Sequence, residues 1–183
     1  MKKKMIALTA ALVLVLSAAV VGTVAWLTDK TQAEVNTFTV GNIDIDLTET
    51  TKDYKMIPGE EIAKNPKVSV EAGSEACWLF VKVDESANLD DFISYTIADG
   101  WTELTGVAGV SGVYYRTVAA DATEREFSVL ANDKVTVKDT VTKADMDAIK
   151  ADSTKQPTLT FTAYAVQQAG FETAAAAWTE ASK

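Results

Sequence analysis

The chain contains no histidine and only one cysteine, Cys77, among its 183 residues. Without histidine it lacks the commonest general base, the commonest zinc ligand and the usual partner of a serine or cysteine nucleophile. A single cysteine also excludes a disulfide within the chain. The sequence has no HExxH, GxSxG, P-loop or GxGxxG motif. We therefore expect no enzymatic activity and no cofactor.

Positive charge is scarce, with 17 basic residues against 26 acidic ones and a formal net charge of −9. Three of the basic residues are Lys2, Lys3 and Lys4, so the remaining chain has 14 basic and 26 acidic residues and a formal charge of −12. Such a surface repels phosphate backbones, which makes nucleic acid a poor partner.

The N-terminus has the pattern of a secretion signal. Three lysines precede a charge-free stretch from Met5 to Thr28. Small residues at Thr23 and Ala25 suit a signal peptidase, and we predict a signal peptide over residues 1–25 with cleavage between Ala25 and Trp26. An uncleaved membrane-spanning helix is the alternative. Both interpretations place residues 30–183 outside the cytoplasm.

About 155 residues follow the signal, enough to bury one hydrophobic core. Two-residue alternation of apolar and polar side chains dominates them and predicts strands. One strand is expected at Val35–Leu47, where the alternation changes phase at Gly41-Asn42 as in a bulge or tight bend. The other expected strands are Tyr54–Ile57, Lys67–Glu71, Ala76–Asp84, Phe92–Ile97, Trp101–Leu104, Val113–Val118, Arg125–Leu130, Lys134–Lys138 and Pro157–Gln167.

Helices are expected at Ala144–Ala151, capped by Thr142, and at Phe171–Ala181. Many short strands with only two short helices predict a mainly β fold, specifically a jelly-roll-like β-sandwich. We expect this domain to span residues 37–183, after a mobile N-terminal segment at residues 26–36.

Few residues are candidates for chemistry. Asn42, Asp44 and Asp46 offer oxygen ligands to calcium, but an extended strand spreads them apart, so a solvated strand face is favoured. Cys77 alternates in phase with apolar residues, which favours a buried, inert thiol over a reactive one. Cross-strand packing is favoured over a carbohydrate or peptide groove for the aromatic residues Trp78, Trp101, Tyr114, Tyr115, Phe161 and Tyr164.

Several stretches resemble the TasA/camelysin family, whose members are exported with a SipW-type signal peptidase. The most specific are Gly22-Thr23-Val24-Ala25-Trp26-Leu27-Thr28-Asp29 and Asn36-Thr37-Phe38-Thr39-Val40-Gly41-Asn42-Ile43-Asp44-Ile45. Ile57-Pro58-Gly59-Glu60, Asn65-Pro66-Lys67-Val68, Ala76–Val83 and Thr160–Gln167 with Phe171 and Trp178 also match, whereas residues 88–150 match weakly.

The resemblance implies a secreted jelly-roll subunit of fibres in a biofilm matrix or on the cell surface. Such subunits assemble into a homopolymer by donor-strand exchange, with accessory matrix proteins as further partners. Here Phe38, Val40, Ile43 and Ile45 would fill the pockets of the next subunit. The alternative is that this strand pairs within its own domain.

Two other functions stay open at this point. The name camelysin implies a cell-surface metallopeptidase, for which the carboxylates of Glu60, Glu61, Asp90 and Asp91 are the available groups, although no histidine or ligand cluster accompanies them. A monomeric surface adhesin would use exposed aromatic residues, the best candidates being Trp101, Tyr114 and Tyr115.

Overall fold

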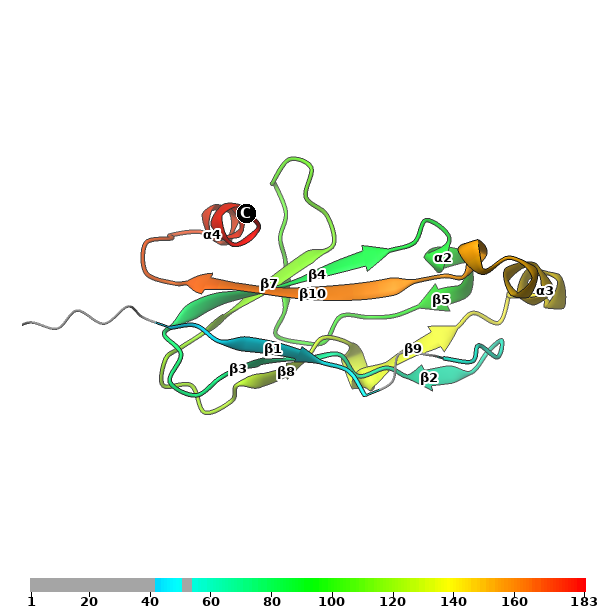
Figure 1. Ribbon diagram of the computed structural model, residues 1–183, viewed down its shortest axis with the longest axis horizontal. Helices are drawn as coiled ribbons and strands as arrows, with labels where there is room; N and C mark the ends of the chain where they lie inside the picture. The colour runs from blue at the N-terminus through cyan, green and yellow to red at the C-terminus, as the bar shows by residue number, and fades with distance from the viewer. Residues whose placement is uncertain (1–41, 51–53) are drawn as a thin grey trace, which may run out of the picture. The chain divides into compact units, whose positions relative to one another are not determined.

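The computed structural model describes residues 42–50 and 54–183, which form a mainly β domain (Figure 1). The predicted signal peptide with its cleavage site at Ala25 and Trp26, the segment 26–36, and the donor candidates Phe38 and Val40 lie outside the described residues. The prediction of a mainly β fold is confirmed.

The described strands form three antiparallel sheets. The first has the order β1 (Ile45–Thr48), β3 (Lys67–Val70) and β8 (Glu126–Ser128). The second has the order β10 (Leu159–Gln167), β4 (Cys77–Glu85), β7 (Val113–Val118) and β6 (Thr102–Glu103). The third has the order β2 (Glu61–Ala63), β9 (Lys134–Val137) and β5 (Ile93–Ser94).

The central strand β4 organises the main core, because its alternate side chains point to opposite faces of the sheet. Cys77, Leu79, Val81 and Val83 pack against Val68 and Val70 of β3 and Phe127 of β8. This contact joins the first and second sheets face to face. On the other face of β4, Phe80 packs against Trp178 of α4 (Ala174–Ala181), so that helix covers the outer side of the second sheet.

A smaller core lies between the third sheet and two helices, α2 (Leu89–Phe92) and α3 (Lys143–Ala151). Its buried members include Ile93, Val135 and Ile149. The Thr142 hydroxyl accepts a hydrogen bond from the backbone N–H of Asp145, and the Asp145 carboxylate accepts one from the backbone N–H of Thr142. This reciprocal cap fixes the start of α3, because it satisfies two amides that have no partner inside the helix.

Most predicted elements are confirmed, with strand ends that differ by two residues at most for Lys67–Glu71, Ala76–Asp84, Val113–Val118, Arg125–Leu130, Lys134–Lys138 and Pro157–Gln167. Of the predicted strand Val35–Leu47, the described part contributes Ile45–Leu47 to β1. Only Thr102–Glu103 of Trp101–Leu104 is a strand. The helix predicted at Phe171–Ala181 begins at Ala174, where the Thr173 hydroxyl caps it.

The strand predicted at Tyr54–Ile57 is wrong. In the described part of the chain, residues 54–57 are irregular rather than extended into a strand, and Ile57 is 60% exposed. Pairing with β9 begins only after the Pro58-Gly59 turn, where Gly59 has a φ of +81° and its N–H donates to the carbonyl of Val137. Likewise, the predicted strand Phe92–Ile97 is mostly replaced by the end of α2, the two residues of β5 and an isolated bridge from Ile97 to Leu130.

Candidate strand-docking groove

Two strand edges that have no pairing partner among residues 42–50 and 54–183 lie side by side on one flank of the domain (Figure 1). Within these residues β10 is hydrogen-bonded to β4 alone and β1 to β3 alone, yet β1 and β10 approach each other closely. Their directions are opposite. The segment that contains β1 begins near Asn42, whose carbonyl accepts a hydrogen bond from the N–H of Glu75. It runs toward Glu49, whose carboxylate pairs with the ammonium group of Lys64. We call these two limits of the flank the Asn42 end and the Lys64 end.

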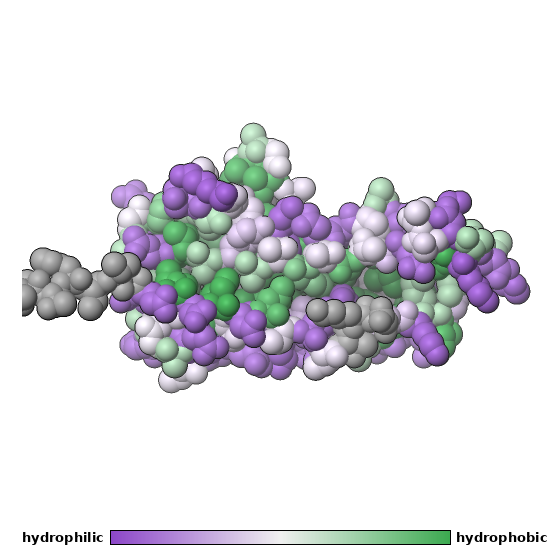
Figure 2. All heavy atoms as spheres, in the orientation of Figure 1, coloured by the Kyte–Doolittle hydropathy of each residue, from purple (hydrophilic) through white to green (hydrophobic). Residues whose placement is uncertain are grey.

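Apolar side chains fill the space between the two edges without being fully buried. β1 and the residues before it contribute Ile43, Ile45 and Leu47, while β10 contributes Leu159, Phe161, Ala163 and Ala165. All seven pack against the main core and remain partly exposed. Figure 2 shows the resulting band of hydrophobic atoms between hydrophilic margins. We call this band with its two strand edges the β1–β10 groove.

The opposite flank of the same two sheets is closed by other segments. The N–H of Ala98 donates to the carbonyl of Val129 at 2.9 Å, which continues the pairing beyond β8. The indole N–H of Trp101 donates to the carbonyl of Ser128 at 2.9 Å. The guanidinium of Arg116 lies 3.6 Å from the centre of the Phe127 ring. Among the described residues, these contacts bridge the two sheets on this flank, where Ile97, Trp101 and Tyr114 are partly buried as the groove residues are.

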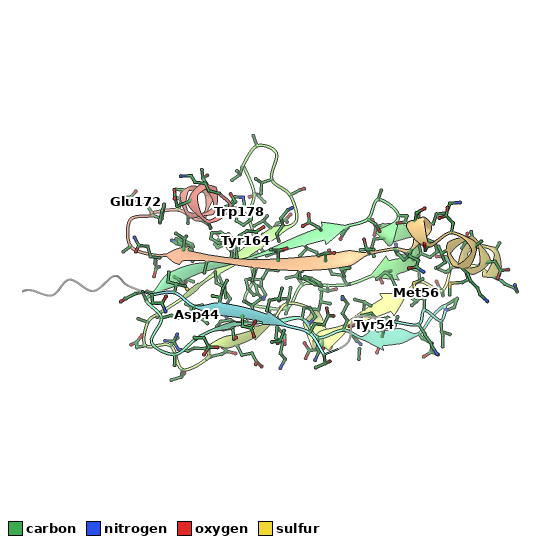
Figure 3. All side chains as sticks on the ribbon, in the orientation of Figure 1. Asp44, Tyr54, Met56, Tyr164, Glu172 and Trp178 are labelled. Atoms are coloured by element: carbon green, nitrogen blue, oxygen red, sulfur yellow. The ribbon has the colours of Figure 1, made fainter. Side chains whose placement is uncertain are left out.

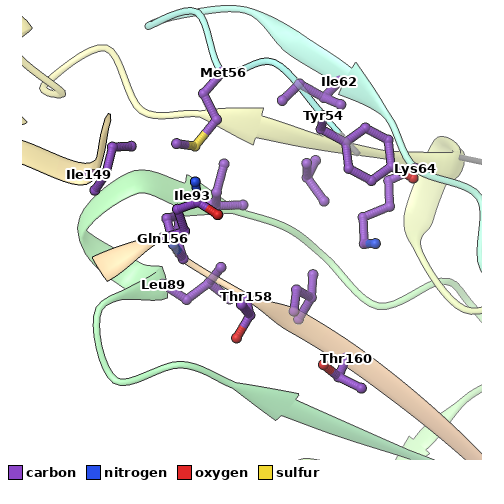
Figure 4. Close-up of a pocket in the computed structure, with 13 residues that line it drawn as sticks. Tyr54, Met56, Ile62, Lys64, Leu89, Ile93, Ile149, Gln156, Thr158 and Thr160 are labelled. Atoms are coloured by element: carbon purple, nitrogen blue, oxygen red, sulfur yellow. The ribbon is translucent and has the colours of Figure 1, made fainter. Parts of the chain in front are cut away.

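A hollow opens at the Lys64 end of the groove (Figure 4). It has a volume of about 580 Å³ and lies between the start of β10 and the smaller core. Its apolar lining comes from Met56, Ile62, Leu89, Ile93, Val135 and Ile149. Gln156, Thr158 and Thr160 form an exposed polar rim. Another hollow, of about 510 Å³, continues toward β1 and is lined by Leu47, Glu49 and Phe161 among others.

Lys64 lines both hollows and is only 7% exposed. Its ammonium nitrogen lies 2.7 Å from Oε1 of Glu49, and the Tyr54 hydroxyl donates to the same oxygen at 2.7 Å. The ammonium also lies 5.0 Å from the centre of the Tyr54 ring and 5.4 Å from that of Phe161. Burial and the bond to Glu49 raise the pKa of Tyr54 well above its usual range. The ion pair of Lys64 with Glu49, together with the Tyr54 hydroxyl, therefore lies where the two hollows meet.

Of the four donor candidates, the structure describes two, and both are used within their own domain. Ile45 pairs with Val70 of β3, and Ile43 packs against the main core. These two residues thus follow the alternative expectation, that the strand pairs locally. In the described domain they form one wall of the groove.

The carboxylates considered for metal binding are dispersed. Asn42, Asp44 and Asp46 are exposed, and Asp44 lies at the start of β1 facing away from the core (Figure 3). The Nζ atom of Lys134 lies 2.5 Å from Oε1 of Glu61, and the Nζ atom of Lys138 lies 3.6 Å from Oδ1 of Asp90. Across the described ranges 42–50 and 54–183, no three histidine, cysteine or acidic residues gather as a metal site would require.

Cys77 and the aromatic residues are packing groups. Cys77 is fully buried in the main core, and burial raises the pKa of its thiol. The ring centres of Tyr164 and Trp178, which lie near each other in Figure 3, are 5.1 Å apart in an edge-on arrangement, and those of Trp78 and Tyr115 are 5.8 Å apart. These contacts are the geometry that aromatic side chains favour in cores. The expectation of a buried thiol agrees with the structure. Cross-strand packing holds for Trp78 and Tyr115, whereas Tyr164 packs on α4 and Phe161 lines the β1–β10 groove.

Sequence reasoning missed the pair of Lys64 and Glu49 and the two hollows next to Lys64. A single lysine in the polar stretch 60–65 carries no periodic signal, and its partner is 15 residues away. The only available hint was the amphipathic pattern of Pro157–Gln167, which gave the apolar face of β10 but not its unpaired edge.

Comparison of the chain with family models, with curated proteins and with solved structures found no match. Among the helices of the described residues, none has the length and hydrophobicity needed to cross a bilayer.

Proposed function

We propose that this protein is a secreted structural subunit of extracellular or cell-surface fibres, with a jelly-roll-like β-sandwich as its folded domain. In this proposal, residues that precede Gly41 in one copy dock as a strand in the β1–β10 groove of the next. The signal-like N-terminus supports secretion, and the resemblance of residues 22–45 to the TasA/camelysin family supports the assembly mode.

The observation that carries the proposal is the pair of facing strand edges that no other described segment pairs with, with apolar side chains between them. An exposed edge presents a row of unsatisfied backbone N–H and C=O groups, which natural proteins normally protect. A docked strand would satisfy those groups and cover the partly exposed apolar atoms at the same time. Main-chain hydrogen bonds supply affinity in such complexes, and alternate side chains supply specificity.

The chain has a segment suited to this role. Residues 26–40 precede the described domain, and fully extended they reach about 50 Å. β10 spans eight residue steps from Leu159 to Gln167, about 26 Å. The segment is therefore long enough to cover the groove, and Phe38 and Val40 lie two residues apart, so that both face the same side of a strand.

Negative-stain electron microscopy tests the proposal. We expect filaments from the exported chain beginning at Trp26 and none from a chain beginning at Gly41. A matched control carries residues 26–40 in scrambled order, which keeps the length and charge of the segment but removes its pattern, and it should also form no filaments. Circular dichroism should be alike for the three proteins.

Monomers from the intact chain at all concentrations and salt conditions would overturn the proposal. Filaments from the chain that begins at Gly41 would overturn the role of residues 26–40 as the docked strand. Such filaments would have to be held together by another contact.

A further inference from the structure

The hollow at the Lys64 end has the size and lining of a small-molecule site. Its volume of about 580 Å³ lies within the range of about 300–1,000 Å³ that is typical of ligand pockets. Apolar side chains from β2, β5, β9, α2 and α3 line it, so water inside the hollow finds few hydrogen-bonding partners. Displacing poorly held water by an apolar body favours binding.

The hollow can be reached from solvent along the start of β10. On this side Gln156, Thr158 and Thr160 are exposed and offer amide and hydroxyl groups. A ligand that enters here would place its apolar part inward and would keep its outer end near this polar rim.

One buried cation faces the hollow. The side chain of Lys64 is 9% exposed, and its nitrogen points into the space between the lining residues (Figure 4). An ammonium group has three N–H donors. Among the residues that the structure describes, Oε1 of Glu49 is the one oxygen within hydrogen-bonding distance of this nitrogen, and its other close neighbours are the rings of Tyr54 and Phe161. Two donors therefore have no oxygen partner from the described part of the chain, and a buried donor without a partner is costly.

The balance of charge around Lys64 selects the kind of acceptor. Within the described residues, Lys64 and Glu49 are the only ionised side chains that line either hollow, and each neutralises the other. A ligand carboxylate would add a negative charge that nothing compensates in a poorly solvated place. An uncharged oxygen accepts the remaining N–H groups of Lys64 without that penalty.

From these observations we infer that the hollow binds a small apolar molecule that carries an uncharged oxygen acceptor, such as a ketone, ester or ether. The oxygen accepts from the ammonium group of Lys64, and the apolar body packs against Leu89, Ile93 and Ile149. This binding function is separate from fibre assembly and does not rest on it.

Three probes of matched shape test the inference. Cumene, acetophenone and benzoate each carry a phenyl ring with a branched substituent of the same size, and they differ in oxygen and charge. Dissociation constants come from ligand-observed NMR titrations of the exported chain that begins at Trp26, at protein concentrations that give no filaments in electron micrographs. Within one variant the ratio of two dissociation constants does not depend on the fraction of folded protein, so a loss of stability does not mimic a loss of selectivity.

The two members of the ion pair should change selectivity in different ways. The unmodified chain should bind acetophenone at least about tenfold more tightly than benzoate, because Glu49 already balances the cation. Lys64→Met should weaken acetophenone relative to cumene by about tenfold, because the variant has lost the N–H donors. Glu49→Gln should shift the ratio of acetophenone to benzoate toward benzoate by at least about tenfold, because the ammonium group can then pair with the ligand carboxylate.

A pair of isoleucine substitutions locates the site. Ile62→Phe narrows the hollow and should weaken acetophenone at least about fivefold, whereas Ile57→Phe, at an exposed residue outside the lining, should change its affinity less than about twofold. Equal effects of these two substitutions, or no binding of acetophenone by the unmodified chain, would overturn the inference. A ratio of acetophenone to cumene that Lys64→Met leaves unchanged would overturn the role of Lys64 as the donor.

Discussion

At the scale of single residues, Lys64 shows how a charge is kept in an apolar environment. Its ammonium group is neutralised by Glu49, and the Tyr54 hydroxyl donates to the same carboxylate oxygen. The aromatic rings of Tyr54 and Phe161 face the cation as well. Removing one partner of such a pair leaves the other charge with poor compensation, which costs more than the pair itself contributes.

We therefore expect Lys64→Met to lower the free energy of unfolding by about 2–3 kcal/mol, and Glu49→Gln by about 1–3 kcal/mol. The double variant should lose less than the sum of the two, because it leaves no uncompensated charge. Urea denaturation of the four proteins measures this coupling. The exposed pair of Lys134 with Glu61 is the control, and Lys134→Met should cost no more than about 0.5 kcal/mol. Strict additivity at Lys64 and Glu49 would show that their charges do not interact.

At the scale of secondary-structure elements, the start of β7 depends on a close backbone approach. Gly112 has a φ of +66°, and a Cβ atom at this position would lie 2.6 Å from the carbonyl oxygen of Val83 in β4. The carbonyl of Gly112 accepts a hydrogen bond from the N–H of Val83 at 2.8 Å. Glycine is thus required here both for its backbone conformation and for its lack of a side chain.

Gly112→Ala should lower the free energy of unfolding by about 3 kcal/mol or more, because the methyl group pushes β7 away from β4. Gly109, in the same loop, has a φ of +75° and open space around its Cβ position. Gly109→Ala therefore isolates the backbone term and should cost about 1 kcal/mol. Chemical denaturation compares the two variants, and similar losses would mean that the contact with Val83 relaxes freely.

At the scale of the whole molecule, the absence of histidine determines how the free energy of unfolding depends on pH. No residue type in the chain has an ordinary side-chain pKa between about 5 and 8.5, so the free energy of unfolding should be nearly constant in this range. Burial raises the pKa of Cys77 above its ordinary value of 9.0. Burial is the largest cause that raises the pKa values of Tyr54, Tyr95 and Tyr114 above 10.0. A hydrogen bond to Glu49 adds to the effect at Tyr54, one to Glu85 adds to it at Tyr95, and the nearby charge of Glu103 adds to it at Tyr114.

The sign of the alkaline effect follows from these directions. The folded chain retains protons that the unfolded chain releases above about pH 9, so the free energy of unfolding should fall as pH rises from there. Urea midpoints between about pH 5.5 and pH 10.5 measure the dependence. Tyr95→Phe should make the alkaline decrease smaller. An unchanged midpoint at the alkaline limit would contradict the assignment of these groups.

The sequence by itself determined the mainly β character, because alternation is a local property of consecutive side chains. It gave the two faces of β4, the inward face of β10 and the Thr142 cap of α3, each from residues within a few positions of one another. It failed at Tyr54–Ile57, where apolar residues precede a turn and the described chain is irregular. Local pattern does not reveal whether a second strand is present to pair.

Only the tertiary structure decided which strand edges have no pairing partner among the described residues. β1 and β10 are separated by more than 100 residues, and nothing in either segment shows that they meet without a hydrogen-bonded register. The hollow at the Lys64 end likewise combines residues from β2, β9, β5, α2, α3 and the start of β10. Edges and cavities arise from long-range packing, and that packing depends on where distant segments are placed relative to one another.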